Sequence, residues 1–108
     1  MLNTLRFCTG EMKAAYAVDK SLLHKGYARI IDQKAVYELY GVRYEGRILY
    51  YLRCAYGKEA VGCYVFCDRA EADRLFFALL RGRVTPCSMR YIVDELVEDP
   101  ENRVVDGV

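Results

Sequence analysis

Several residue types and patterns are scarce or missing in this 108-residue chain, which has no tryptophan, one histidine and two prolines. No apolar stretch approaches the roughly 20 residues that a membrane-spanning helix needs, and the start of the chain has no long apolar run typical of a secretory signal. The G-x-G-x-x-G, P-loop and H-E-x-x-H patterns are missing, which removes the common nucleotide and zinc-hydrolase signals. These absences predict a cytoplasmic protein that does not enter a membrane.

Cysteine is present, but not in a pattern that indicates chemistry. The five cysteines include no C-x-x-C pair, and their odd number is typical of free thiols that act as small hydrophobes in a reducing compartment. A catalytic thiol needs an activating neighbour, and the one imidazole, His24, lies in the segment with the weakest structural signal. We therefore expect no enzyme activity, no catalytic residue, no metal ion and no cofactor.

The composition is that of an ordinary globular domain. Apolar residues make up 54% of the chain and charged residues 29%, a mixture too apolar for a disordered chain. Residues 1–108 are expected to form one small domain. The net charge of +1 provides no overall attraction to nucleic acid or to a membrane. The ten tyrosines are many for this length and direct attention to the surfaces on which they lie.

Residues 1–34 form a variable N-terminal segment. Gly26 is placed to end a helix at a left-handed C′ position, and the stretch YARII at 27–31 predicts a short strand. The expected helix is amphipathic, and its apolar face would consist of Met12, Ala15, Tyr16, Leu22 and Leu23.

Residues 35–67 predict a three-stranded antiparallel meander. The stretches AVYELYGVRY, RILYYLRCAY and VGCYVFC are dense in β-branched, aromatic and other apolar residues that fit a pleated sheet. The pair Glu45-Gly46 separates the first two stretches, and its glycine supplies the positive φ that a tight hairpin turn requires. A loop over 57–60 separates the second stretch from the third.

Residues 68–99 predict two helices. Asp68 and Glu71 have the spacing of an N-cap and its capping-box partner, and Gly82 is placed to close the first helix.

The second helix is expected to start at Thr85 as the N-cap, with Pro86 at the first helical position, and residues 100–108 are expected to be a loose tail. The predicted fold class is therefore α+β. It comprises a three-stranded antiparallel meander with two C-terminal amphipathic helices packed on one face, and a further helix in the N-terminal segment.

The two hairpins determine which residues face each other. A two-residue turn at 45–46 sets Glu38 opposite Arg53 as a cross-strand ion pair, and the longer loop over 57–60 sets Cys54 opposite Cys63. Cys63 and Cys67 share a strand face but lie about 13 Å apart, given a rise of about 3.3 Å per residue, which is too far for both to bind one zinc ion.

The register also separates the sheet into two faces, of which the core face lies beneath the helices. The second face carries the candidate interface residues Tyr40, Tyr51, Tyr64, Phe66, Arg47 and Arg53. Three interpretations of this aromatic face stay open. Residues 1–34 fold over it, or it pairs with another copy or another protein, or it stacks single-stranded nucleic acid. A basic cluster at Arg81, Arg83 and Arg90 adds slightly to the last interpretation, although cations also suit helix ends.

The stretch RVTPCSMRYIVDELVED, together with AYG at 55–57, resembles a family of short bacterial proteins known as a domain of unknown function. The chain departs from the family's pattern after Pro86, where members often carry a histidine and this chain has Cys87. The resemblance implies a small intracellular α+β protein of bacterial type and supplies no activity. It covers about residues 35–99 and rests on Tyr56, Gly57, Asp68, Val84, Thr85, Pro86, Val93 and Leu96.

The sequence as a whole predicts a non-enzymatic protein-interaction or regulatory module that self-associates or binds a protein partner. One alternative is a single-stranded nucleic-acid-binding module that uses the aromatic and arginine side chains of the second face. Another alternative is a metal or small-molecule site built on Cys54, Cys63 and Cys87.

Overall fold

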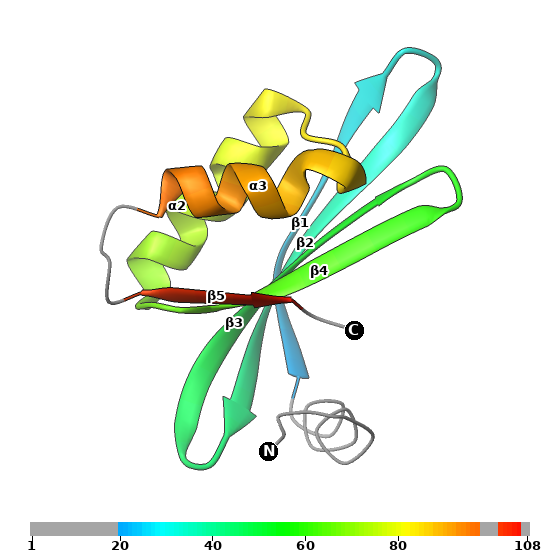
Figure 1. The fold of residues 1–108 in the computed structure, drawn as a ribbon. Helices are drawn as coiled ribbons and strands as arrows, with labels where there is room; N and C mark the ends of the chain where they lie inside the picture. Colours follow the sequence, from blue (N-terminus) through cyan, green and yellow to red (C-terminus); the bar gives the residue numbers. More distant parts are fainter. Residues whose placement is uncertain (1–19, 98–101, 107–108) are drawn as a thin grey trace.

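One antiparallel sheet with two helices against one of its faces makes up the part of the protein that the computed structural model describes, residues 20–97 and 102–106 (Figure 1). Within these residues the sheet has five strands in the order β1-β2-β3-β4-β5. The strands are β1 (Lys20–Ile30), β2 (Gln33–Tyr44), β3 (Arg47–Tyr56), β4 (Glu59–Phe66) and β5 (Arg103–Asp106), and the helices are α2 (Arg69–Gly82) and α3 (Pro86–Leu96).

The predicted three-stranded meander is wrong, because β1 and β5 extend it at its two edges. Residues 20–26, expected to end a helix, instead belong to β1 and pair with β2, apart from Leu23, where the register shifts between Leu22 and His24. Gly26 is not a helix C′ residue; it lies opposite Tyr37, and a Cβ on it would come within 2.9 Å of the Leu80 side chain. The glycine therefore lets α2 pack closely on β1. Residues 12–19 of the expected helix lie outside the described residues.

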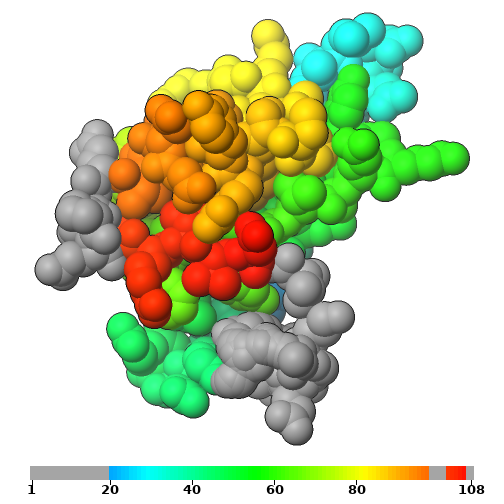
Figure 2. Space-filling view, viewed as in Figure 1, coloured from blue at the N-terminus to red at the C-terminus, as the bar shows by residue number. Residues whose placement is uncertain are grey.

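The expected loose tail is also wrong for residues 103–106, which form β5 against β4. The guanidinium of Arg90 on α3 donates a hydrogen bond of 2.7 Å to the carbonyl of Val104, and the Val104 side chain packs against the main core. Figure 2 shows α3 and β5 side by side on the surface, where this contact joins them. The rest of the tail, 100–101 and 107–108, lies outside the described residues.

The first hairpin has the predicted register, with Glu38 opposite Arg53 and 3.3 Å between their charged atoms. Its turn residues Glu45 and Gly46 both have positive φ, 52° and 74°, which is the type I′ geometry that matches strand twist.

The predicted register of the second hairpin is wrong by two residues. Its turn consists of Gly57 and Lys58 alone, so Cys54 lies opposite Val61 and Cys63 lies opposite Leu52. Because side chains alternate with a period of two, a slip of two residues leaves every side chain on its predicted face. The two-face division of the sheet therefore survives the error.

The core lies between the sheet and the helices, on the face predicted for it. The Tyr37 hydroxyl donates a hydrogen bond of 2.7 Å to the Val84 carbonyl in the connection between the helices. Burial raises the pKa of Tyr37 to about 12, and the neighbouring Cys54 contributes a smaller increase. The fully buried side chains include Tyr37, Leu39, Leu52, Cys54, Val65, Leu75, Phe76, Leu79, Met89 and Val93.

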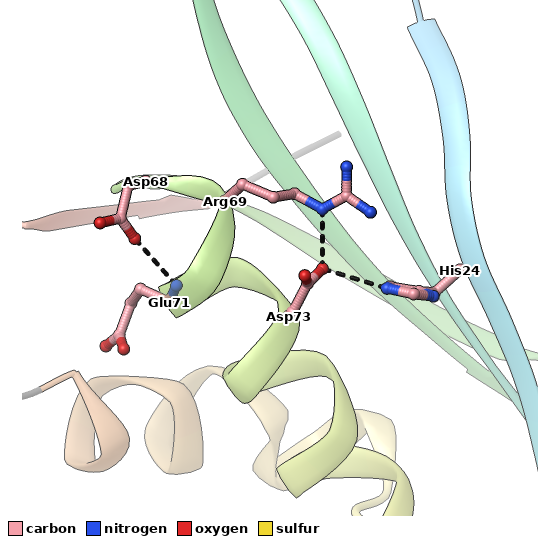
Figure 3. A network of polar contacts seen from close by, with 5 residues as sticks. All are labelled: His24, Asp68, Arg69, Glu71 and Asp73. Atoms are coloured by element: carbon pink, nitrogen blue, oxygen red, sulfur yellow. Dashed lines mark hydrogen bonds and ion pairs between the residues drawn. The ribbon is translucent and has the colours of Figure 1, made fainter.

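Both helices begin where the sequence predicts. The Asp68 carboxylate accepts a hydrogen bond of 2.9 Å from the backbone N–H of Glu71 (Figure 3), and Thr85 is the N-cap before Pro86. The end of α2 differs by one residue, because Gly82 is still helical and Arg83 adopts the left-handed conformation, with φ 50° and ψ 48°. The backbone N–H groups of Arg83 and Val84 donate hydrogen bonds to the carbonyls of Leu80 and Leu79, which is the usual pattern at a glycine-capped helix end.

We predict that Ile31→Asn stabilises the protein. Ile31 has a φ of 60° in the β1–β2 turn and is 89% exposed, so a β-branched residue is strained there while its side chain buries little surface. Asparagine tolerates this conformation, and we expect the free energy of unfolding in urea to rise by about 1 kcal/mol. The control is Ile48→Asn, at an exposed site within β3, which should lower stability because asparagine is disfavoured in strands. A loss of stability in Ile31→Asn would show that the positive φ of Ile31 does not strain the backbone.

Candidate functional site

The sheet face turned away from the helices, called here the second face, concentrates positive charge. The strand pairings place seven basic side chains and a single carboxylate, Glu38, on it among the described residues. Glu38 is only 12% exposed and contacts Lys25 at 3.7 Å and Arg53 at 3.3 Å. The basic residues of the second face are Lys20, Lys25, Arg29, Lys34, Arg47, Arg53 and Arg103.

Four of these cations lie against aromatic rings of the same face. The Lys20 ammonium is 4.7 Å from the ring centroid of Tyr40 and 5.3 Å from that of Tyr51. The other contacts involve Tyr27, which has the ammonium of Lys34 at 4.5 Å and that of Lys25 at 5.9 Å, and Phe66, which has the Arg103 guanidinium at 4.8 Å. Such distances are typical of cation–π contacts, so the second face combines rings and cations along its whole length.

The helices, in contrast, pair much of their charge internally. Arg69 contacts Asp73 at 2.8 Å, Arg74 contacts Glu71 at 2.7 Å, and Arg90 contacts Asp94 at 3.3 Å. The net charge of +1 therefore conceals a strongly positive sheet face, and the total charge was a poor guide to the surface.

In one half of the second face, called here the closed half, the side chains pack against one another and are largely buried. Val42, Leu49 and Tyr51 form a small buried cluster there, and Tyr51 is only 5% exposed. The predicted interface residues Tyr40, Tyr64 and Phe66 pack against this cluster and are partly buried. The Tyr51 ring lies 4.8 Å from the ring of Tyr64 and 6.1 Å from that of Tyr40, centroid to centroid. These rings are neighbours as predicted, and they pack against one another.

The two predicted interface arginines lie at separate places. Arg47 is exposed beside the β2–β3 turn, opposite Tyr44. Arg53 lies in the other half of the face, in the row Lys25–Glu38–Arg53 that crosses three strands. The structure therefore brings the six predicted residues onto one face without gathering them at one point.

The open half of the second face lies toward the β1–β2 turn and carries what we call the basic patch. Its centre is Tyr27, whose side chain is 53% exposed. Its members are Lys25, Tyr27, Arg29, Lys34 and Arg53. Sequence reasoning found only Arg53 among them. It placed Lys25 in a helix, and it placed Tyr27 and Arg29 in a short strand without pairing that strand with the sheet. The signal that could have found them is the alternation Lys25-x-Tyr27-x-Arg29, which is typical of a strand.

A second polar cluster holds β1 on the helical layer (Figure 3). Nε2 of His24 lies 3.0 Å from Oδ1 of Asp73 on α2, and the same oxygen accepts a hydrogen bond of 2.8 Å from Arg69. The His24 ring also stacks on Phe76, with 5.2 Å between centroids. The hydrogen bond from Arg69, followed by that from His24, lowers the pKa of Asp73. This cluster fixes the strand that carries the basic patch.

The cysteines of the alternative metal or small-molecule site do not come together. Cys54 and Cys63 are buried, whereas Cys87 is exposed. Burial raises the pKa of Cys54 to about 11 and that of Cys63 to about 12, so both thiols are protonated at neutral pH and are weak ligands and nucleophiles. In residues 20–97 and 102–106 no group of three or more Cys, His, Asp or Glu side chains is arranged to hold a metal ion. Cys8 lies outside the described residues.

A cavity of about 580 Å³ lies where β4 extends beyond the end of β5. Its walls include Met89 and Arg90 of α3, Asp106 of β5 and Gly62 of β4. Arg90 is engaged there by Asp106 at 3.4 Å and by Asp94. Gly62 is required for packing, because a Cβ at this position would overlap the hydroxyl of Tyr51.

Comparison with known proteins adds no identity. No protein family, curated protein or solved structure matches the chain, so the resemblance to a domain of unknown function stays an expectation. Neither α2 nor α3, the helices of the described part of the chain, is long and apolar enough to cross a membrane.

We predict that Gly62→Ala destabilises the protein. The added methyl group would displace the buried Tyr51 ring, and overpacking of this kind costs about 1–3 kcal/mol. The control is Gly41→Ala, whose Cβ would meet its nearest neighbour, the Leu23 side chain, at an ordinary 3.4 Å. In a Tyr51→Ala background the cost of Gly62→Ala should fall. Urea unfolding of the unchanged protein, the two single variants and the double variant measures this coupling. An undiminished cost in the Tyr51→Ala background would show that Tyr51 is not the obstacle.

We predict that Asp73→Asn loosens β1 in a pH-dependent manner. The folded protein holds the pKa of Asp73 below its ordinary value of 3.8. Ionised Asp73 therefore stabilises the fold above that ordinary value, and the contribution is lost as pH falls through the lower folded-state pKa. The side chain is 33% exposed, so the loss at pH 7 should be below about 1 kcal/mol, and it should shrink below about pH 4.

Amide hydrogen exchange in β1 is the measurement that separates this anchor from a general effect. At pH 7, Asp73→Asn should speed exchange in β1, whereas Asp94→Asn, which removes an ion pair within α3, should not. Equal acceleration of β1 in both variants would contradict the anchoring role.

Proposed function

We propose that the protein is a non-enzymatic interaction module that binds an anionic partner through the basic patch. The observation that supports this proposal is the segregation of charge, since the second face carries seven basic side chains and one carboxylate on a chain of net charge +1. Proteins use such local fields to attract partners of opposite charge.

The exposure of the side chains favours the basic patch as the contact area. Lys25 is 43% exposed and Arg53 38%, while their shared partner Glu38 is mostly buried. The patch thus presents four cations to the solvent around an exposed tyrosine, and Tyr and Arg are residue types enriched at interfaces. The closed half of the face, around Val42 and Tyr51, has little side-chain surface to offer.

The same charge argues against a symmetric dimer formed face to face. Two copies stacked on their second faces would bring like charges together, which opposes association. Self-association, if it occurs, is therefore expected through another surface, and the partner of the second face is expected to be acidic.

We predict that the protein is retained on a heparin column at low salt and that Lys34→Glu elutes at a lower salt concentration. Heparin is a general polyanion, and loss of one contacting cation weakens such binding and its dependence on salt. Arg81→Glu is the matched control, because it makes the same change of charge at an exposed position at the end of α2.

The control variant should elute with the unchanged protein. If the protein is not retained, or if both variants shift equally, binding does not depend on the basic patch and the proposal is wrong.

A further inference from the structure

We infer that the anionic partner is single-stranded nucleic acid, with a base stacked on Tyr27 and the adjoining phosphates held by the cations of the basic patch. This inference rests on the proposed function and names the partner class. It depends on three features of the open half of the second face: an exposed ring, a row of small side chains, and basic side chains on either side of that row.

Tyr27 can act as a stacking surface. It lies on β1, an edge strand, and its side chain is 53% exposed. The ring has the Lys34 ammonium at 4.5 Å and that of Lys25 at 5.9 Å, so two cations stand within reach of any group that stacks there. Lysine side chains are flexible, and when a base takes the ring, Lys34 can turn to the phosphate of the same nucleotide. Base–aromatic stacking combined with cations is the usual mode of single-strand binding.

A row of small side chains continues from Tyr27 across the sheet. Tyr27 lies opposite Val36, which lies opposite Ala55, which lies opposite Ala60. Four strands at about 4.8 Å spacing give this row a length of about 14 Å. Val36 and Ala55 are partly exposed and Ala60 is exposed, so bases and sugars can approach the backbone of the sheet without displacing large side chains.

Basic side chains flank the row on both sides. The neighbouring row toward the β1–β2 turn contains Arg29 opposite Lys34. The neighbouring row on the other side contains Lys25 and Arg53 with the mostly buried Glu38 between them. Rows on one face are about 7 Å apart, so a chain laid along the row has cations within side-chain reach on either side. This arrangement suits a polymer with apolar bases and a continuous line of phosphates.

Other anionic partners fit less of this arrangement. An acidic peptide can use the cations but has no base to stack on Tyr27. A nucleic acid duplex keeps its bases paired and stacked, so that only its phosphates are available to this face. The exposed ring is therefore the feature that distinguishes a single strand from the other two.

The test is fluorescence anisotropy with labelled 12-nucleotide oligo-dT and oligo-rU, with a DNA duplex and poly-glutamate as comparison ligands. We expect at least one single strand to bind more tightly than either comparison ligand. For three or four phosphate contacts, the slope of log affinity against log salt should be about −2 to −3. The oligo-dT and oligo-rU arms then distinguish DNA from RNA.

Three tyrosine variants test the stacking. Tyr27→Ala should weaken single-strand binding at least about 5-fold, and Tyr27→Phe, which keeps the ring, should stay within about 2-fold of the unchanged protein. Tyr91→Ala is the matched control, since Tyr91 is an exposed tyrosine on α3. Tyr27 and Tyr91 are both largely exposed, so both alanine variants are expected to fold, and circular dichroism verifies this.

The outcomes separate the two proposals. Binding of poly-glutamate or heparin through the basic patch, without binding of either single strand, overturns this inference and leaves the proposed function standing. Equal binding of the duplex, or single-strand binding that Tyr27→Ala leaves intact, also overturns it. No binding of any polyanion overturns both proposals.

Discussion

The pairing of β1 with β2 is the constraint on which the rest of the account depends. It converts the alternation along β1 into two different surfaces: His24 and Gly26 face α2, while Lys25 and Tyr27 face away from it. Because side chains in a strand alternate strictly, none of these residues could exchange faces without a slip that would also bury charge. The core and the basic patch are therefore two consequences of one register.

That register also explains how a nearly neutral chain acquires a charged surface. The helices neutralise much of their charge through short pairs such as Arg69–Asp73 and Arg74–Glu71. On the second face of the sheet, Glu38 is the sole carboxylate among the described residues and it serves two cations at once. Strand pairing thus gathers basic side chains on one face of the sheet. The net charge of the whole sequence does not reveal this, because acidic residues elsewhere offset it.

The sequence was most informative where a local rule decides the structure. The Glu45-Gly46 turn, the Asp68 cap and the Thr85-Pro86 helix start follow from turn and capping chemistry, and all three are confirmed. The predicted register of the second hairpin was wrong, because Gly57 and Lys58 make a two-residue turn where a longer loop was expected. Because the error is two residues, each cysteine and tyrosine of this hairpin still lies on the sheet face predicted for it.

The edges of the sheet were not predictable in the same way. Leu22, Leu23 and Gly26 fit a helical face followed by a terminating glycine, and tertiary contact with α2 overrides that pattern by using Gly26 for close approach to Leu80. The short β5 carries too few residues for a reliable period and depends on contacts from α3. Residues 27–31 were expected to form a strand, but its pairing with β2 was missed, and with it the part of the candidate site around Tyr27. The tyrosines of the central strands lie on one face, as predicted.

The most direct measurement of the central claim is a two-dimensional NMR titration of the 15N-labelled protein with oligo-dT. We expect amide shift changes concentrated at residues 25–36 and around Arg53 and Ala55, with little change in α2 or α3. Shifts confined to the helices, or spread evenly over the surface, would contradict the claim that the open half of the second face is the binding surface.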